Sequence, residues 1–267
     1  MRWACMPVAD LAVIIRFKDS ASTLPEVLAA LRAQTVQPAQ MIGVNSGSRD
    51  GSDVLIREAG GTVARWDAPY HHARCLNFGI AQCTAKWVLI LSSHTVLRAP
   101  DTIAAMIAAM ELSGTACVSG RWTAKDDWSD AITWPELQRT GLRFCSIYSN
   151  RFGMIRRELW EQRMFDETLV TMEDYAWALE QVRAGHTCRR LSFPFSYQRS
   201  AHNRDYTFAA VTFHLARLYG LRVGWLGWKG TIAALISGFF RRGRVSQKTH
   251  LGRLRASFST SCPAVER

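Results

Sequence analysis

Short apolar runs alternate with amphipathic segments along the first 122 residues of the chain. Residues 11–17, 39–45, 62–66, 87–91 and 115–122 are short, rich in apolar residues and bounded by polar or turn-forming residues, which is typical of β-strands. The segments between them have the pattern of helices: a first one that begins at residue 23, then 50–59, 70–83 and 100–112. Strands that alternate with helices predict a parallel or mixed sheet with helices on both faces.

Local signals mark where some of these helices begin and end. Thr23 and Glu26 have the spacing of a capping box at the start of the first helix. The apolar face of that helix consists of Leu24, Val27, Leu28 and Leu31. Thr171 is expected to cap a later helix over residues 172–184, and Gly185 is expected to end it.

The alternation becomes irregular after residue 122. Residues 123–150 are rich in Asp, Trp and Arg, and we expect them to loop across one face of the sheet before residues 151–155 re-enter it as a strand. The sequence therefore predicts an α/β fold with one domain over residues 1–205. A basic, aromatic, helical extension is expected over residues 206–256, and a disordered tail over residues 257–267.

Composition and charge limit the class of protein. A chain of 267 residues, of which 48% are hydrophobic and 21% charged, can bury one large core. The N-terminal apolar stretch is interrupted by Asp10 and lacks a small-residue cleavage site, so no signal peptide is expected. The formal charge of +11 favours an anionic partner: nucleic acid, a membrane surface or a phosphorylated small molecule.

The cysteines favour a reducing compartment. There are seven, an odd number, and none belongs to a CxxC pair, which argues against a disulfide framework and against a zinc site. The expected location is therefore the cytoplasm. The positions are Cys5, Cys75, Cys83, Cys117, Cys145, Cys188 and Cys262.

Three groups of polar residues lie where a predicted strand ends or a predicted helix begins. They are the turn at residues 45–50, the sequence Ser92-Ser93-His94, and the pair Glu173-Asp174. In open α/β sheets, ligands bind in the crevice beyond the carboxyl ends of the strands. The three groups are therefore candidates for one binding site.

The stretches IIRFKD, VNSGSRDGS, RCLNFGI, LILSSH, GR and FDE with EDYAW follow one another in an order and spacing that resemble the family 2 glycosyltransferases with the GT-A fold. They look most like the branch whose members read IIRTKNE, VDSGSTDGT, GRSLNLG and SAH at these places. The resemblance covers about residues 12–202. It implies a mixed, mostly parallel sheet flanked by helices. It also implies transfer of a sugar from a nucleotide-sugar donor (UDP-, TDP- or GDP-linked) to a hydroxyl of a glycan or lipid-linked acceptor, with inversion, in polysaccharide or glycolipid assembly.

The resemblance places the nucleotide at the ends of the first strands. The residues assigned to this pocket are Arg16, Asp19, Asn45, Ser46, Asp50, Arg74, Asn77, Ser92 and Ser93. In the family an Asp usually stands where Asn45 stands; the Asn carbonyl can still accept a hydrogen bond, and its amide can donate. Taken alone, residues 45–52 are also typical of an ordinary turn built by Asn, Gly and Asp.

The metal site departs from the family pattern. Most members end the strand that corresponds to residues 88–91 in an Asp-x-Asp motif, which holds a divalent metal against the donor diphosphate; here the residues are Ser92, Ser93 and His94. An imidazole is a good ligand for Mn²⁺ or a related divalent ion, and His202 resembles a late His that returns to the metal in related enzymes. The alternative is that His94 is a polar residue before a helix. Without a metal, Arg74 and Arg121 could supply the positive charge.

The resemblance assigns the proton chemistry to Asp174, as the general base that deprotonates the acceptor hydroxyl. Glu173 is expected to contact the acceptor or to stabilise the loop, and Trp177 with Arg121 to lie near the diphosphate or the acceptor. Acidic residues in a first helical turn are also favoured by the helix dipole, and a tryptophan in a helix is often core. Both interpretations stay open for these residues.

The extension over residues 206–256 lies outside the resemblance. Its apolar run, residues 230–240, is too short to span a bilayer, but it could lie among lipid headgroups with its arginines on anionic lipid. A helix that packs against the catalytic domain would have the same pattern.

Three further classes of protein compete with an active glycosyltransferase. Nucleic-acid binding is not expected, because no recognised motif is present. A catalytically inactive scaffold with the same fold stays open, because the metal-binding carboxylates are missing. A nucleotidyltransferase on a similar sheet would carry a glycine-rich basic loop after its first strand, and this chain lacks one.

Overall fold

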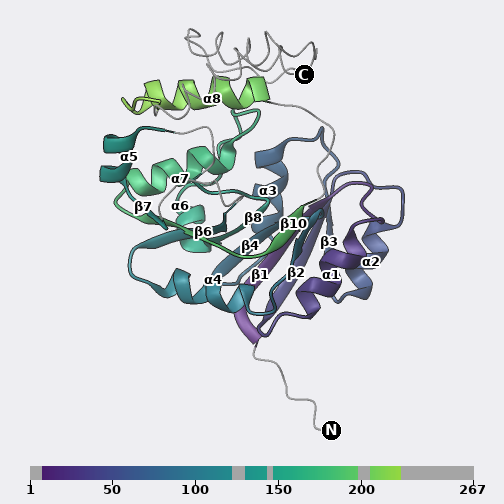
Figure 1. Cartoon of the computed structure of the whole chain (residues 1–267). Coiled ribbons are helices and arrows are strands. Elements are labelled where there is room, and N and C mark those ends of the chain that lie inside the picture. Colours follow the sequence, from purple (N-terminus) through teal and green to yellow (C-terminus); the bar gives the residue numbers. More distant parts are fainter. Residues whose placement is uncertain (1–7, 122–129, 143–146, 198–204, 224–267) are drawn as a thin grey trace, which may run out of the picture.

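The computed structural model describes residues 8–121, 130–142, 147–197 and 205–223. Their central element is an eight-stranded mixed sheet with strand order β3-β2-β1-β4-β8-β6-β9-β7 (Figure 1). Its strands are β1 (Val8–Phe17), β2 (Gln37–Asn45), β3 (Thr62–Arg65), β4 (Trp87–Ser92), β6 (Thr115–Gly120), β7 (Ala131–Ile132), β8 (Phe152–Arg156) and β9 (Thr187–Leu191). Strands β1 to β4 are parallel, whereas β8 is antiparallel to both of its neighbours.

Helices cover both faces of this sheet (Figure 1). One face carries α1 (Leu24–Arg32), α2 (Ser52–Glu58) and α4 (Thr102–Glu111). The other face carries α3 (His72–Ile80), α5 (Trp134–Thr140), α6 (Arg157–Gln162), α7 (Glu173–Arg183) and α8 (Asp205–Leu218). The described ranges contain no helix with the length and hydropathy needed to cross a membrane. The predicted α/β class with covered faces is confirmed.

The alternation of side chains along β1 explains the two apolar layers. Leu11, Val13 and Ile15 point into the layer with α1 and α4, and Ala12 and Ile14 into the layer with α3 and α7. All are fully buried, which matches the continuous apolar runs of a strand covered on both faces. By the same alternation, Arg16 belongs to the face of α3 and α7.

Helix α3 lies unusually close to the sheet because of one glycine. A Cβ atom added at Gly79 would come within 2.5 Å of Cγ2 of Val44 on β2. The glycine thus lets the end of α3 approach the carboxyl end of β2 closely.

Several predicted boundaries differ from the structure. The capping box is wrong: Thr23 has helical backbone angles and its hydroxyl donates to the carbonyl oxygen of Ser20. Thr171 is not the N-cap of α7, because that position is held by Met172 in the left-handed region with φ of 63°. Residues 131–132 and 134–140, predicted as loop, form β7 and α5. A second, two-stranded sheet pairs β5 (Thr95–Leu97) with β10 (Phe195–Tyr197).

The first part of the predicted extension belongs to the domain core. Val211, Leu215 and Ala216 of α8 are buried in the same apolar cluster as α7. Val223 then forms an isolated β-bridge with Leu142. Residues 206–223 therefore share the core of the domain predicted over residues 1–205. The apolar run at residues 230–240 and the tail at 257–267 lie outside the described residues.

Candidate functional site

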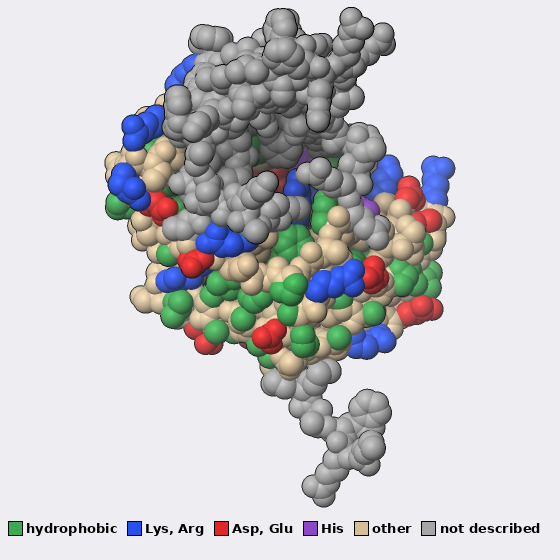
Figure 2. All heavy atoms as spheres, viewed as in Figure 1, with side chains coloured by type: hydrophobic (Ala, Val, Ile, Leu, Met, Phe, Trp, Pro, Cys, Tyr) green, Lys and Arg blue, Asp and Glu red, His purple; other side chains and the backbone are tan. Residues whose placement is uncertain are grey.

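The polar groups singled out in the sequence meet at one edge of the sheet. Because β1, β2 and β4 are parallel, their last residues lie side by side, and Arg16 pairs in register with Ser92. Strand β8 is antiparallel to β4, so its start lies at the same edge, where the Ser92 N–H donates to the Arg151 carbonyl oxygen over 2.9 Å. Figure 2 shows basic, acidic and histidine side chains gathered in a hollow on this face.

The turn after β2 is tied together by its own side chains. The side-chain oxygen Oδ1 of Asn45 accepts from the N–H groups of Gly47 and Ser48 at 3.0 and 2.7 Å. Asn45 itself is only 3% exposed. This is an Asx-turn, and it occupies the oxygen that the resemblance assigned to the nucleotide. A nucleotide contact through the Asn45 amide group stays a prediction.

Asp19 and Asp50 join this turn to the loop that follows β1. Asp19 accepts from the Arg49 N–H at 2.9 Å, and Asp50 accepts from the Ala21 N–H at 2.7 Å and from Ser52. The Ser52 hydroxyl and then the Ala21 N–H hold the pKa of Asp50 below its usual value. Both carboxylates thus stabilise the two loops that border the site.

Two serines of the Ser92-Ser93-His94 sequence also have protein partners. The Ser92 hydroxyl oxygen accepts from the His94 N–H at 3.3 Å. The buried Ser93 hydroxyl lies 3.0 Å from the hydroxyl of Ser20. These contacts hold the β4 end against the β1 loop, next to the predicted ligand position. Likewise, the Ser46 hydroxyl donates to the carbonyl oxygen of Phe17.

His94 is half-buried and presents one ring nitrogen to the site. Its Nδ1 lies 3.4 Å from the Thr23 hydroxyl oxygen. Because that hydroxyl donates to the Ser20 carbonyl oxygen, its oxygen can accept a hydrogen bond from Nδ1–H, and in this tautomer Nε2 carries a lone pair. Burial and then the charge of Arg16 lower the pKa of His94, so the ring is neutral at neutral pH. The ring also stands edge-on to Tyr197, with centroids 6.5 Å apart.

The pair Glu173-Asp174 begins α7 and is held by Asn150, just before β8. The Asn150 N–H donates to Oδ2 of Asp174 at 2.9 Å, and its side-chain amide donates to Oε1 of Glu173 at 3.3 Å. Oδ1 of Asp174 also accepts from the Tyr175 N–H at 2.7 Å. The start of α7 thereby reaches the carboxyl edge of the sheet.

Burial shifts both carboxyls toward the protonated form. Burial, and next the charge of Asp174, raise the pKa of Glu173 to about 7. Burial also raises the pKa of Asp174, against the hydrogen bonds from Asn150 and Tyr175. Asp174 receives two short backbone hydrogen bonds, whereas Glu173 receives one longer bond, so Asp174 is the better stabilised anion. Of the two carboxyls, Glu173 is therefore the one that takes up a proton more readily, and Asp174 is the one that the surrounding N–H groups favour as the anion.

The backbone is strained on both sides of this edge. Among the described residues other than glycine, only Asp19 and Met172 have positive φ, 46° and 63°. One follows β1 and the other precedes Glu173. Left-handed backbone at such residues costs free energy and is concentrated at functional sites, which agrees with the placement of this site.

The comparisons with known proteins agree with the geometry. Residues 12–170 match the family described as Glycosyl transferase family 2, which is more than half of the chain. The chain belongs to this family. The O-antigen chain rhamnosyltransferase RfbN of Salmonella typhimurium is 23% identical over 195 residues, which are 66% of this chain. The chain spans 62% of the length of that curated relative.

Solved structures share the fold of this family 2 chain. A mannosyltransferase from Pyrobaculum calidifontis, in complex with GDP-Man and Mn²⁺, superposes with a TM-score of 0.61 at 16% identity, over 93% of this chain and 75% of the other. TarS residues 1–349 from S. aureus, in complex with UDP-GlcNAc, gives 0.58 at 14% identity, over 92% and 79%. The GT-A architecture expected from the resemblance is thus confirmed.

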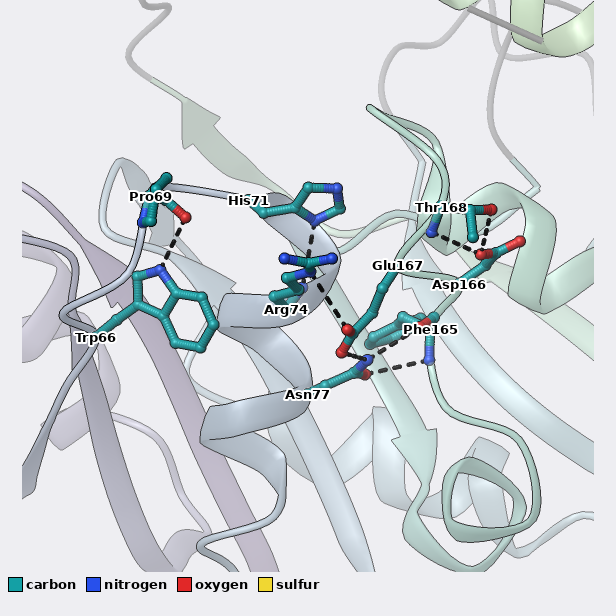
Figure 3. A network of polar contacts seen from close by, with 9 residues as sticks. All are labelled: Trp66, Pro69, His71, Arg74, Asn77, Phe165, Asp166, Glu167 and Thr168. Carbon is teal, nitrogen blue, oxygen red and sulfur yellow. Dashed lines mark hydrogen bonds and ion pairs between the residues drawn. The ribbon is translucent and has the colours of Figure 1, made fainter. Parts of the chain in front are cut away.

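Arg74 and Asn77, which the resemblance assigned to the nucleotide pocket, instead contact the loop before α7 (Figure 3). The Asn77 amide group donates to the Phe165 carbonyl oxygen and to Glu167, and its oxygen accepts from the Phe165 N–H and from Trp160 Nε1. Arg74 forms an ion pair with Glu167 at 3.4 Å. The structure thus corrects the assignment of Asn77: its polar atoms bind α3 to the loop before α7.

The assignment of Trp177 to the diphosphate or the acceptor is also corrected. Its side chain is 2% exposed, its Nε1 donates to the Arg163 carbonyl oxygen at 2.7 Å, and it packs against Tyr148 and Phe165. Its environment is that of the helix core, which is the common environment of a tryptophan in a helix. It also borders a cavity of about 480 Å³ between α7 and α8, which Glu173 and Asp174 do not line.

Arg121 follows β6, and its guanidinium is paired with Asp130. A role at the diphosphate would require that ion pair to open. His202, the second metal ligand suggested by the resemblance, lies outside the described residues.

Three functional candidates were not found from the sequence. Asn150 holds both carboxylates, Arg151 lowers the pKa of Asp174 through its charge, and Tyr197 stands against both His94 and the Arg151 guanidinium. All three come from segments far from the motifs in sequence. The only signal was the position of Asn150 directly before a predicted strand and of Arg151 at its first residue.

Proposed function

We propose that the chain transfers a sugar from a nucleoside diphosphate sugar to an acceptor hydroxyl, with inversion at the anomeric carbon. The observation that supports this most is the position of Asp174, a carboxyl group held by the Asn150 N–H at the sheet edge that also carries Arg16 and His94. An in-line displacement requires a base for the acceptor hydroxyl and a positive charge for the leaving diphosphate, close to each other.

In this proposal Asp174 takes the proton of the acceptor hydroxyl as its oxygen bonds to the anomeric carbon. The bond between that carbon and the diphosphate oxygen breaks on the opposite side, and the electron pair leaves with the nucleoside diphosphate. A raised pKa makes Asp174 a stronger base than an exposed carboxylate would be. Burial raises the pKa of Glu173 to about 7, and this residue orients the acceptor or the loop.

The donor is proposed to be a UDP-, TDP- or GDP-linked hexose or deoxyhexose. The rhamnosyltransferase relative supports a deoxyhexose, and the fold neighbours in complex with GDP-Man and UDP-GlcNAc support hexoses. The nucleotide would lie over the turn after β2, near Asn45 and Ser46. The acceptor is proposed to be a glycan or lipid-linked sugar in polysaccharide or glycolipid assembly, and the location cytoplasmic. Association with a membrane surface through the tail rests on residues outside those described.

The donor atoms for a divalent metal are incomplete in the described part of the chain. His94 offers the Nε2 lone pair, but the hydroxyls of Ser92 and Ser93 have protein partners, and Arg16 carries positive charge next to the imidazole. The described residues contain no group of three His, Cys, Asp or Glu side chains placed to hold a metal ion. A solved neighbour binds Mn²⁺ with UDP, so Mn²⁺ or Mg²⁺ on His94 and His202 is kept as a proposal, without a step that depends on it.

A thermal-shift screen tests the proposal. The purified chain is melted with UDP, TDP and GDP and with the matching nucleotide sugars, each with Mn²⁺, with Mg²⁺ and with EDTA. A ligand present at 100 times its dissociation constant stabilises the folded state by about 2.7 kcal/mol, which is a measurable shift. The proposal predicts a higher melting temperature with the nucleotides of one nucleobase. It also predicts that the chain releases the nucleoside diphosphate from the matching nucleotide sugar when an acceptor is added. The absence of any shift would favour the inactive scaffold.

A further inference from the structure

Arg16 brings a cation to the site with one nitrogen, Nη1, that is not hydrogen-bonded to any described residue. Its Nη1 atom is buried, and no hydrogen-bond partner for it exists among the residues that the structure describes. The guanidinium lies over the Tyr70 ring, 5.5 Å from the ring centroid. A buried N–H group without a partner costs free energy, and it is retained where a ligand supplies the acceptor.

The charge of Arg16 reaches the groups on both sides of the site. It lowers the pKa of His94 at the end of β4, and it lowers the pKa values of Glu173 and Asp174 at the start of α7. Yet none of the ion pairs within the described ranges includes Arg16. Arg16 pairs in register with Ser92 at the end of β4, its charge acts on the predicted base as well, and no described carboxylate forms an ion pair with it.

The other arginines of this edge have partners. Arg74 is paired with Glu167, Arg121 with Asp130, and Arg151 lies over the Tyr197 ring at 5.3 Å. The end of β4, where the family carries metal-binding carboxylates, has none in this chain. A diphosphate requires a positive charge beside it. The end of β4 has no carboxylates to hold a metal ion there, and Arg16 is the described cation placed to supply that charge.

We propose that the Arg16 guanidinium binds the donor diphosphate directly and stabilises the negative charge that develops on it as the sugar leaves. The proposal rests on the proposed function, because it assumes a nucleoside diphosphate in this site. As the anomeric carbon–oxygen bond breaks, the electron pair moves to the diphosphate oxygen, and the Nη N–H groups donate to that oxygen. A planar guanidinium suits this role, because it can donate two parallel hydrogen bonds to phosphate oxygens.

Nucleotide binding without metal tests the proposal. Affinities for UDP, TDP and GDP, and for the matching nucleosides, are measured by calorimetry in EDTA for the wild type, Arg16→Gln and Arg16→Lys. Arg32→Gln is the control, since it removes one charge from an exposed position at the far end of α1. We expect the wild type to bind one diphosphate in EDTA, and Arg16→Gln to bind it about tenfold to a hundredfold more weakly, the range of a charge-assisted hydrogen bond.

The nucleoside comparison separates a diphosphate contact from a structural role. If Arg16 contacts the diphosphate, Arg16→Gln leaves nucleoside affinity unchanged, Arg16→Lys recovers part of the lost affinity, and Arg32→Gln behaves as the wild type. Equal diphosphate affinity in Arg16→Gln and the wild type would overturn the proposal. So would wild-type binding that is absent in EDTA and appears with Mn²⁺. If the wild type binds no diphosphate under any condition, the proposed function itself fails, which is a different result.

Discussion

Asn150 holds Asp174 in place from a segment 24 residues earlier in the chain, through a backbone N–H that lies 2.9 Å from Oδ2. The side-chain amide of Asn150 also donates to Glu173, so this single residue orients both carboxylates from the segment that precedes β8. Because its contact with Asp174 is made by the backbone N–H, any substitution at position 150 other than proline keeps the donor. The position of the proposed base is thus fixed by the fold of the β8 edge.

Asp174→Asn should abolish transfer and leave nucleotide binding intact. The substitution removes the base while changing the side-chain volume little, and loss of a general base typically lowers a rate by about 10²- to 10⁴-fold. The rate of nucleoside diphosphate release in the presence of acceptor is compared with the diphosphate affinity of the same variant. Turnover close to that of the wild type would remove Asp174 from the mechanism.

Glu173→Gln should change the pH dependence of stability. The folded-state pKa of Glu173, about 7, lies above its ordinary value of 4.5, so its burial costs nothing below pH 4.5, and the cost grows as the pH rises toward 7. The wild type should therefore lose stability relative to Glu173→Gln across this window, by ~3 kcal/mol at most. Urea unfolding of both proteins at pH 5 and pH 8 measures the difference. Parallel pH profiles would show that Glu173 is ionised in the folded state.

His94→Ala should remove whatever part of donor binding depends on a divalent metal. Nε2 of His94, with its lone pair, is the ligating atom that the described site offers, and alanine has no such nitrogen. The melting temperature with nucleoside diphosphate is compared in Mn²⁺ and in EDTA for both proteins. We expect the difference between the two conditions to disappear in the variant. An undiminished Mn²⁺ effect would make His94 a structural residue.

Asn77→Ala should destabilise the fold without weakening nucleotide binding. The substitution leaves the buried Phe165 N–H and the Trp160 Nε1 without their acceptor, and each buried polar group without a partner costs about 1–3 kcal/mol. The free energy of unfolding and the diphosphate affinity are both measured. A large loss of affinity in a folded variant would restore Asn77 to the nucleotide pocket.

The strands and helices follow from local patterns, and these were predictable. The apolar run at residues 87–91 lies within β4, and residues 11–17 lie within β1, because a strand covered on both faces must be apolar throughout. Strand β5 was not predictable in this way. Its three residues are a strand only because they pair with β10, about 100 positions later.

The sequence by itself determined the α/β alternation, the family, and the order of the chemical groups along the chain, since each depends on residues close together in sequence. The tertiary structure decided which of those groups share a site. Asn77 and Trp177 belong to the motifs that carry the resemblance. Their polar atoms are nevertheless hydrogen-bonded to segments more than 10 residues away, so both side chains are part of the packed interior. Arg16 and Asp174 come to one edge of the sheet because parallel strands end there and the start of α7 is hydrogen-bonded to it.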